Sequence, residues 1–510
     1  MALAADPPIE RDTVSKEIGT AVRHTFVYGI GGILTKALSF LLLPLFTHYL
    51  SPRDYGVLEI IDLSMSLLGM FLNMGITASL LRYYGAAESE QDKRKVVGTL
   101  FRFTVVTGLL IFAVGALQVN KATLLLFGPG VPPKYLLLSF ASFVLAYIAN
   151  IPYTYLRAKE ASGALVTLDT VTSFVVLVLN IVFIAVFKMS ILGMLLSPLM
   201  VGTIRLAVLI KWMGRVVGVG MDWILLRGLL AFGAPLVLSD LTGFIVNFSD
   251  RFFLQRYQSL EIVGIYAVGY KFAYMLNFLF IQPFNMMWHG RMYVIHRQPN
   301  HRRVFAQVFV LYSVVLMLAA LGLALFSSDV IRVMADPRYA AGEQVIGPVA
   351  LGYVFLGMSY YVRSGMFLVS RTGLVGIVCA VAAAVNLVAN YFLISNFGML
   401  GAAWATLLGF CAIAVGSYYC SQRVCPLDLA AGRVVKALAL AIGIYVLSRG
   451  LRPASLAVGL LLKGALLASF PAILFFAGMF SPDEIATLRS LKESAVNGTA
   501  RLLKSAGIKM

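Results

Sequence analysis

Long, nearly unbroken runs of apolar residues recur along the chain. A helix that crosses a membrane needs about twenty such residues. The composition agrees, because 60% of the 510 residues are hydrophobic and only 13% are charged, whereas soluble proteins are about one quarter charged. The runs do not alternate with polar residues as the strands of a membrane barrel do. The sequence therefore predicts an all-α polytopic membrane protein.

We predict fourteen transmembrane helices from these runs. Their expected ranges are 25–47, 57–80, 96–118, 134–156, 164–187, 190–212, 227–254, 262–286, 304–326, 343–367, 374–395, 398–420, 433–449 and 455–479.

An internal repeat indicates two lobes of six helices. FVYGIGGILTK (26–36) matches LAFGAPLVLSD (230–240), and SPRDYGVLEI (51–60) matches SLEIVGIYAV (259–268), which aligns Gly56 with Gly264. VLNIVFIAVFKMSILG and VANYFLISNFGMLG form a third such pair. Internal repeats are a recurrent plan of transporters. The predicted parts are a cytoplasmic amphipathic N-terminus at 1–24, an N-lobe at 25–220, a C-lobe at 221–425, two further helices at 426–480 and a cytoplasmic amphipathic tail at 481–510.

Basic residues set the predicted orientation. Lys93, Arg94 and Lys95 follow the second span, and Arg302 and Arg303 follow the eighth. Loops rich in lysine and arginine stay in the cytoplasm, so both termini are expected there. The net charge of +18 is explained in the same way, without a nucleic-acid partner.

The sequence does not indicate an enzyme. It lacks Walker, HExxH and GxSxG motifs, which carry nucleotide, zinc and acyl-transfer chemistry. The four cysteines form no CxxC or Cys/His cluster, so we expect no disulfide, no metal and no cofactor. The N-terminus lacks the pattern of a cleaved signal peptide.

Polar residues follow single faces of the first two spans and of their repeat mates, spans 7 and 8. Residues spaced by four, seven and eleven positions share a helix face, and charge within a span is costly unless it faces protein or water. These faces predict a water-filled cleft. Its candidate residues are Lys36, Glu59, Asp62, Asn73, Asp240, Asn247, Asp250, Arg251, Tyr270, Lys271 and Tyr274.

Several of these charges also have a structural interpretation. Asp250 and Arg251 can form an interhelical ion pair, and Glu59 and Asp62 suit a helix N-terminus. Arg82 is a gate residue or a cytoplasmic anchor. Arg363 either binds substrate or extends to the cytoplasmic surface.

Three segments in order resemble the polysaccharide flippases of the multidrug/oligosaccharidyl-lipid/polysaccharide exporter superfamily. They are LPLFTHYLSPRDYGVLEI with GITASLLRYY, then SDRFFLQRY with VGIYAVGYKFAYM, and VNLVANYFLISNFGMLGAAWATLL. The resemblance covers nearly the whole chain. It implies movement of a polyprenyl-pyrophosphate-linked oligosaccharide, such as an O-antigen or exopolysaccharide unit, by alternating access. The movement would be from the inner to the outer leaflet of a bacterial inner membrane.

The resemblance also implies roles for the candidate residues. Lys36, Arg251, Lys271 and Arg363 would contact pyrophosphate or acidic sugars, with Asn73, Asn247, Tyr270 and Tyr274 as further substrate-binding residues. Glu59, Asp62, Asp250 and Arg82 would form gating or ion-pair contacts. The related lipid II flippases have a sodium site made of an acid in span 7, Asn-x-x-x-Asp in span 11 and a threonine in span 12. Asp240, Asn386 and Thr406 are similar to this pattern, and Asn390 stands where the pattern has its second acid.

Sodium or a proton is therefore the expected coupling ion, and asparagines that only bond between helices are the alternative. The expected partners are the lipid-linked glycan, membrane lipid, and a polysaccharide polymerase or glycosyltransferases, with the chain itself a monomer. Two other functions stay open. They are a multidrug or small-cation antiporter of the same superfamily, and a membrane polysaccharide polymerase or ligase.

Overall fold

The structure is a computed structural model, and it describes residues 40, 42–214, 220–451 and 455–480. Throughout these residues the chain forms helices and no strand. Lys36, the terminal segments 1–24 and 481–510, and most of the predicted first span lie outside the described residues. Eleven described helices are long and apolar enough to cross a membrane, or twelve if a bent pair within residues 223–257 counts as one span. The protein is thus an all-α, multi-pass membrane protein.

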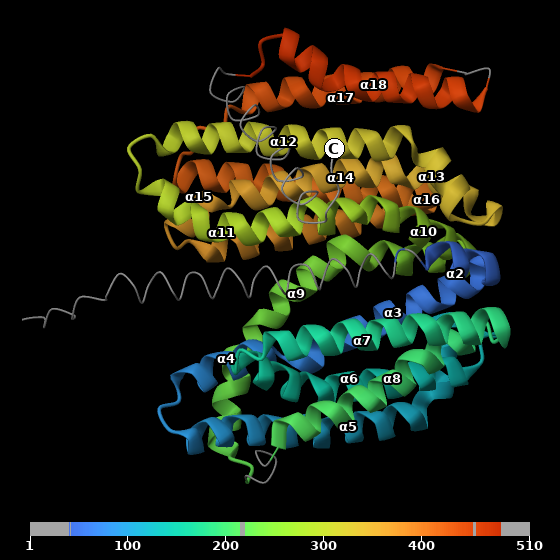
Figure 1. Ribbon diagram of the computed structural model, residues 1–510, viewed down its shortest axis with the longest axis vertical. Helices are drawn as coiled ribbons and strands as arrows, with labels where there is room; N and C mark the ends of the chain where they lie inside the picture. The colour runs from blue at the N-terminus through green and yellow to red at the C-terminus, as the bar shows by residue number, and fades with distance from the viewer. Residues whose placement is uncertain (1–39, 41, 215–219, 452–454, 481–510) are drawn as a thin grey trace, which may run out of the picture. The chain divides into compact units, whose positions relative to one another are not determined.

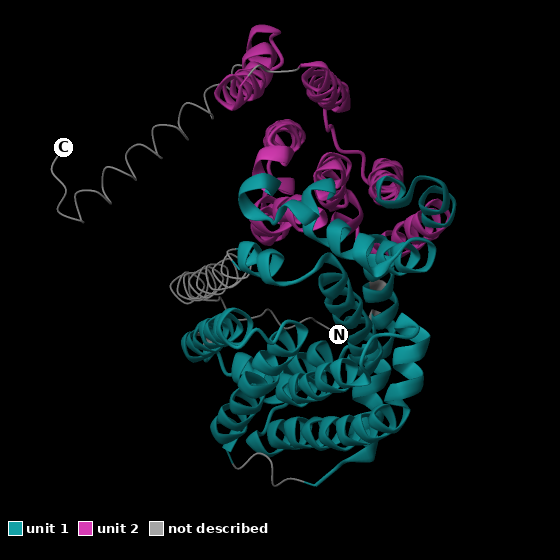
Figure 2. Cartoon of the chain, turned by 90° about the vertical axis from the view of Figure 1, so that its right-hand side faces the viewer, with its two compact units in different colours: residues 1–268, 331–341, 390–402 teal, residues 269–330, 342–389, 403–510 magenta. Residues whose placement is uncertain are grey.

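The chain divides into two compact units, which Figure 2 distinguishes by colour. Unit 1 comprises residues 1–268, 331–341 and 390–402, and unit 2 comprises residues 269–330, 342–389 and 403–510. These units group the chain by contact, so the predicted lobes 25–220 and 221–425 stay predictions.

Helices α2 to α9 belong to unit 1, which also contains the first half of α10. Their bounds are α2 Leu43–Tyr49, α3 Pro52–Asn73, α4 Ile76–Ala86, α5 Glu90–Phe127, α6 Pro133–Ala158, α7 Ser162–Ile181, α8 Ile191–Met213, α9 Trp223–Tyr257 and α10 Leu260–Leu276. Helix α6 packs against both α5 and α8 (Figure 1). A buried apolar core joins α4, α5, α6, α7, α8 and the start of α9.

The later helices build most of unit 2, where α12 lies beside α14 and contacts α17 and α18. Their bounds are α11 Gln282–His296, α12 His301–Leu325, α13 Ser327–Met334, α14 Glu343–Val362, α15 Ser364–Leu368, α16 Thr372–Val424, α17 Ala431–Gly450 and α18 Leu456–Phe476. Short π-helices cover Val182–Val186 (η1) and Asn277–Ile281 (η3), and a short 3-10 helix covers Pro337–Gly342 (η4).

Helix α16 contains two helices that meet at Gly398, whose φ of 55° interrupts the helical backbone. Glycine adopts this left-handed conformation without the clash that a Cβ would cause. The break falls at the first residue of the predicted span 398–420, just after the two-residue gap that follows 374–395. The total of fourteen spans is not confirmed, since the structure describes only the end of the first.

The helix that contains the start of the second predicted span, 57–80, begins earlier, at Pro52, with a strong N-terminal cap. The side chain of Ser51 accepts a hydrogen bond from the Asp54 N–H, the Asp54 carboxylate accepts one from the Ser51 N–H, and Pro52 is at the first helical position. This reciprocal capping satisfies N–H groups that the helix itself leaves unbonded. The span breaks at Met74 and Gly75, which take left-handed conformations between α3 and α4.

Two glycines bring α3 and α10 into backbone contact within unit 1. A Cβ built on Gly56 would overlap the carbonyl oxygen of Leu260, and one built on Gly264 would overlap that of Pro52. The two contacts are reciprocal, because each glycine faces the carbonyl four residues before the other. Gly56 and Gly264 are also the pair that the sequence repeat aligns.

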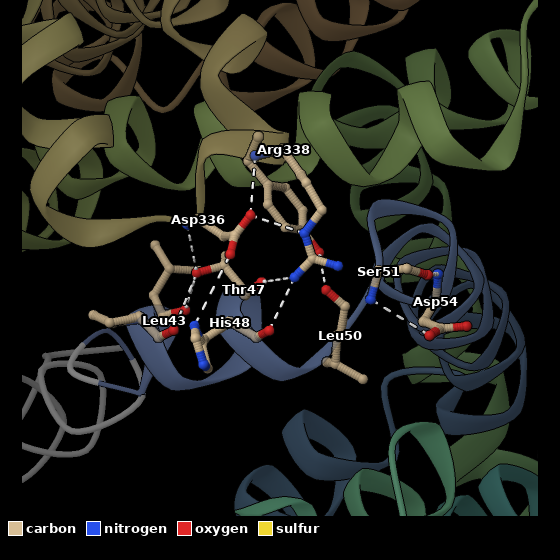
Figure 3. A network of polar contacts seen from close by, with 10 residues as sticks. Leu43, Thr47, His48, Leu50, Ser51, Asp54, Asp336 and Arg338 are labelled. Carbon is tan, nitrogen blue, oxygen red and sulfur yellow. Dashed lines mark hydrogen bonds and ion pairs between the residues drawn. The ribbon is translucent and has the colours of Figure 1, made fainter.

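A loop segment of unit 1 holds the end of α2 (Figure 3). Arg338 donates from Nη2 to the carbonyl oxygens of Thr47 at 3.1 Å and His48 at 2.9 Å, and from Nε to Asp336 at 2.8 Å. Tyr339 donates to the carbonyl of Leu50 at 3.1 Å. The last carbonyls of a helix lack partners within it, so Arg338 caps α2. Its hydrogen bond to Asp336 lowers the pKa of that carboxyl.

Candidate functional site

A cavity of about 1260 Å³ lies within unit 1. Its walls come from α3, α6, α7 and α8, with the start of α4, Leu42, Phe46 and Asp240 completing the lining. The lining is partly polar although the helices are apolar overall. Its polar members are Asp62, Ser66, Asn73, Thr77, Ser139, Ser142, Tyr147, Asn150, Tyr153, Thr172, Ser173, Asn180, Arg205 and Asp240.

An amide cluster joins α6 to α3 and α4 in this cavity. The Asn150 Nδ2 donates to Asn73 Oδ1 at 3.1 Å and to Thr77 Oγ1 at 3.0 Å. Amide and hydroxyl groups both donate and accept hydrogen bonds. Such groups in a concave site fix the orientation of a polar ligand, and sugar hydroxyls have the same dual capacity.

Arg205 and Tyr153 also line the cavity, and both contact Asp169 beside it. Arg205 on α8 pairs through Nη2 with Asp169 Oδ1 on α7 at 2.7 Å. Tyr153 on α6 donates to Asp169 Oδ2 at 2.7 Å, and its ring centroid lies 5.2 Å from the Arg205 Cζ. Three helices therefore meet at one ion pair, and Arg205 is the cation among the described residues that line the cavity.

A second charged network in unit 1 surrounds Arg251. Its Nη1 donates at 2.7 Å to Asp250 Oδ1 and at 2.7 Å to the Asn247 carbonyl, and its Nε lies 3.6 Å from Glu59 Oε1. Tyr266 donates to the other oxygen of Asp250, and the Tyr266 ring centroid is 5.0 Å from the Arg251 Cζ. The network joins α3, α9 and α10.

This network is deeply buried, since Asp250 and Arg251 are each 1% exposed. Neither residue is among those that line the cavity. The geometry therefore favours the structural ion pair that the sequence left open for Asp250 and Arg251. A contact between Arg251 and substrate stays a prediction.

The remaining unit 1 candidates are divided between the cavity and other surfaces. Asp62, Asn73 and Asp240 line the cavity. Asn247 donates to the Gly243 carbonyl of its own helix at 2.8 Å. Arg82 is exposed, with its Cζ 4.2 Å from the ring centroid of Phe232, and its gating role stays a prediction.

The substrate-binding candidates of unit 2 lie on α10 and, for Arg363, directly after α14. Tyr270 is buried and accepts a hydrogen bond from Tyr353 at 3.0 Å, and the ring of Tyr274 meets the Tyr353 ring edge-on at 5.9 Å. Lys271 is exposed on the same helix. Arg363 is 7% exposed; it donates to Ser417 Oγ and to Cys379 Sγ, both at 3.4 Å.

The predicted ion-coupling residues belong to different units. Asn390 of unit 1 donates to Ser249 Oγ at 3.0 Å, while Asn386 of unit 2 donates to the Ala405 carbonyl at 3.0 Å. Asp240 is exposed in the cavity of unit 1, and Thr406 is buried in unit 2. Among the described residues, no group of three histidines, cysteines or acids is placed to hold a metal ion. The ion site stays a prediction.

Sequence reasoning missed Asp169 and Arg205. Both lie inside predicted spans, at 164–187 and 190–212, and charge within a span is itself a sign of function. The same rule had selected Lys271. The helix-face comparison used only spans 1, 2, 7 and 8, so it did not reach these two residues.

The sequence matches the model of a known protein family. A family model described as "Polysaccharide biosynthesis protein" matches residues 21–287, just over half of the chain. The chain belongs to this family. The resemblance seen in the sequence is thereby confirmed at the level of the family.

One protein sequence and two solved structures that are similar to this chain extend the comparison. An uncharacterized membrane protein of Methanocaldococcus jannaschii is 21% identical over 76% of this chain and 82% of its own length. The lipid II flippase MurJ, in an inward closed conformation, has a TM-score of 0.70 at 13% identity and covers 90% of this chain and 100% of its own. A mutant of the Vibrio cholerae MATE transporter VcmN has a TM-score of 0.58 at 18% identity and covers 81% and 98%. At these identities, the solved structures establish a shared fold.

Proposed function

We propose that the protein is a flippase that moves a polyprenyl-pyrophosphate-linked oligosaccharide across the bacterial inner membrane. The observation that carries this proposal is the partly polar cavity of about 1260 Å³ among membrane-crossing helices in a polysaccharide biosynthesis family member. Polar groups at membrane depth are tolerated where they line a water-filled space. The amides of Asn73 and Asn150 and the hydroxyl of Thr77 suit sugar hydroxyls.

The transport cycle that we propose is alternating access driven by a sodium or proton gradient. The fold shared with MurJ and MATE transporters supports a transporter with a substrate space among its helices. The polyprenyl tail stays in the bilayer because each buried CH₂ favours lipid by about 0.8 kcal/mol. The protein therefore has to shelter only the polar head group and sugars.

The decisive experiment separates the lipid-linked glycan pool by leaflet in a deletion strain. We expect glycans that remain linked to the polyprenyl carrier to collect on the cytoplasmic leaflet, and a plasmid copy to restore the outer pool. A complemented strain carrying Asn73→Ala and Asn150→Ala is expected to restore it poorly, with Ser395→Ala, an exposed change outside the cavity, as the control. A normal leaflet distribution in the deletion strain would refute the flippase.

A small-cation antiporter is the second candidate, because two carboxylates, Asp62 and Asp240, line the cavity. Carboxylates favour cationic ligands by charge. Under this alternative the deletion strain becomes sensitive to cationic drugs while its surface polysaccharide stays normal. The two functions thus give opposite results in the same strain.

A further inference from the structure

The Arg205 guanidinium in the unit 1 cavity has more hydrogen-bonding capacity than the protein uses. A guanidinium carries five N–H donors. The ion pair with Asp169 engages Nη2, and the Arg205 Nε is buried with no hydrogen-bond partner among the described residues. The side chain is 35% exposed on the cavity side of α8. A buried donor without an acceptor is costly, so the protein itself does not satisfy this guanidinium. Nε is enclosed, and it is the exposed part of the guanidinium that can meet an acceptor in the cavity.

Asp169 holds this guanidinium in place without covering it. Its two oxygens are both engaged, one by Arg205 and the other by the Tyr153 hydroxyl. The carboxylate therefore contacts the guanidinium through a single nitrogen rather than through the parallel pair of bonds typical of arginine and carboxylate. The remaining donors of Arg205 match a second anion, because a guanidinium forms paired bonds to phosphate and carboxylate.

A complementary acceptor lies farther along α7. Asn180 lines the same cavity and is 6% exposed, and its Oδ1 is buried with no hydrogen-bond partner in the described chain. Asn180 follows Asp169 by eleven residues, which places both on nearly the same helix face about 16 Å apart along the axis. One end of the cavity thus lacks an acceptor, and the other lacks a donor.

We propose that Arg205 binds the anionic group of a glycan substrate, and that Asn180 accepts a hydrogen bond from a sugar hydroxyl of the same molecule. The ligand class is a polyhydroxylated chain that carries an anion at one end. The anion is a phosphate of the carrier lipid or the carboxylate of an acidic sugar. This assignment rests on the proposed flippase function and specifies its substrate contacts.

Binding to the purified protein in nanodiscs tests the anion site. The probes are farnesyl pyrophosphate, which has the head group without sugar, and a free uronic-acid disaccharide. We expect Arg205→Gln to lower the affinity for at least one of these probes tenfold or more. Arg205→Lys should lower that affinity less, because lysine keeps the charge but loses the paired donors. Lys211→Gln, on the same helix and exposed, removes the same charge and should leave both affinities unchanged. Loss for farnesyl pyrophosphate identifies the carrier phosphate as the anion, and loss for the disaccharide alone identifies an acidic sugar.

Asp169→Asn provides an independent test if Arg205→Gln fails to fold. It keeps the side-chain shape and removes the competing negative charge, so we expect anion affinity to rise severalfold. Unchanged affinity, or weaker binding, would overturn the anion site and leave Arg205 and Asp169 as a structural pair. So would a folded Arg205→Gln protein that binds both probes as the parent does.

Asn180→Leu tests the other end of the cavity. This change should lower the affinity for the disaccharide and leave the affinity for farnesyl pyrophosphate unchanged. If the variant binds the disaccharide as tightly as the parent protein does, Asn180 has no part in the site. The flippase and these contacts can fail separately. If the deletion strain traps glycan on the cytoplasmic leaflet and Arg205→Gln binds both probes normally, the flippase function stands and the Arg205 site is rejected. If the deletion strain has a normal glycan distribution and Arg205→Gln loses anion binding, the anion site stands and the flippase function is rejected.

Discussion

At the scale of single residues, Arg251 and Arg205 show how differently two arginines within membrane helices can be placed. Arg251 is enclosed by Asp250, Glu59 and Tyr266, while Arg205 lies at a cavity wall. Both stand out in the sequence as charges inside apolar runs. Sequence periodicity placed Asn247 and Arg251 on one face, but it could not show whether that face meets other side chains or water. Burial depends on which distant helices pack against a face, and the residue pattern of one helix does not give that information.

Arg251→Met is expected to destabilise the protein before it affects any transport step. Removing one partner from a buried ion network costs roughly 3–5 kcal/mol, because uncompensated charge stays buried; here Asp250 and Glu59 would lose their cation. Thermal unfolding in detergent, with expression level beside it, measures the effect. Arg256→Met, an exposed change one turn along the same helix, is the control. A stable Arg251→Met protein that no longer transports would instead indicate the substrate contact.

At the scale of helices, the sequence predicted most spans because hydrophobic length is a strong signal, and it also predicted the break near Gly398. It did not predict that α3 stops at Met74 and that α4 continues the span. Left-handed conformations at Met74 and Gly75 interrupt a run that stays apolar on both sides. The hydropathy of the sequence therefore does not reveal this break. The close approach of α3 and α10 was equally invisible as a contact, although the repeat had aligned its two glycines.

Gly56→Ala and Gly264→Ala are expected to destabilise the protein by similar amounts, about 1–3 kcal/mol each. Each added methyl would meet a backbone carbonyl, which cannot rotate away as a side chain does. Because both changes push the same two helices apart, the double variant should cost less than the sum of the singles. Melting temperatures of the purified variants measure this. Gly243→Ala, where an added Cβ meets nothing, should be neutral or stabilising by up to about 1 kcal/mol; equal behaviour of all three variants would contradict the contact.

At the scale of the whole molecule, composition was enough for the class of protein, and three short segments were enough for the family. The number of spans and the boundaries of the lobes were harder to obtain, because they depend on breaks and contacts that no local pattern encodes. Residues 331–341 and 390–402 lie late in the sequence but pack in unit 1. Their assignment depends on contacts such as that of Arg338 with α2, which join residues nearly three hundred positions apart.

The orientation in the membrane gives a whole-chain prediction. With all four native cysteines replaced by alanine, a single cysteine at Pro129 should react with a membrane-impermeant maleimide added outside intact spheroplasts. One at Glu88 should react only after the membrane is opened. Both positions are exposed, so accessibility depends on the side of the membrane. The opposite labelling pattern would place the termini outside.

The reciprocal contact of Gly56 and Gly264 has a consequence for ancestry. When residue i of one copy meets residue j of another, and j meets i, the two copies are related by a two-fold axis. An ancestor of half the present length, pairing with an identical subunit, would have met its partner at this one glycine. Gene duplication and fusion would turn that single ancestral position into two codons that are free to diverge. The contact requires glycine on both sides, so we expect related sequences to retain or lose the two together.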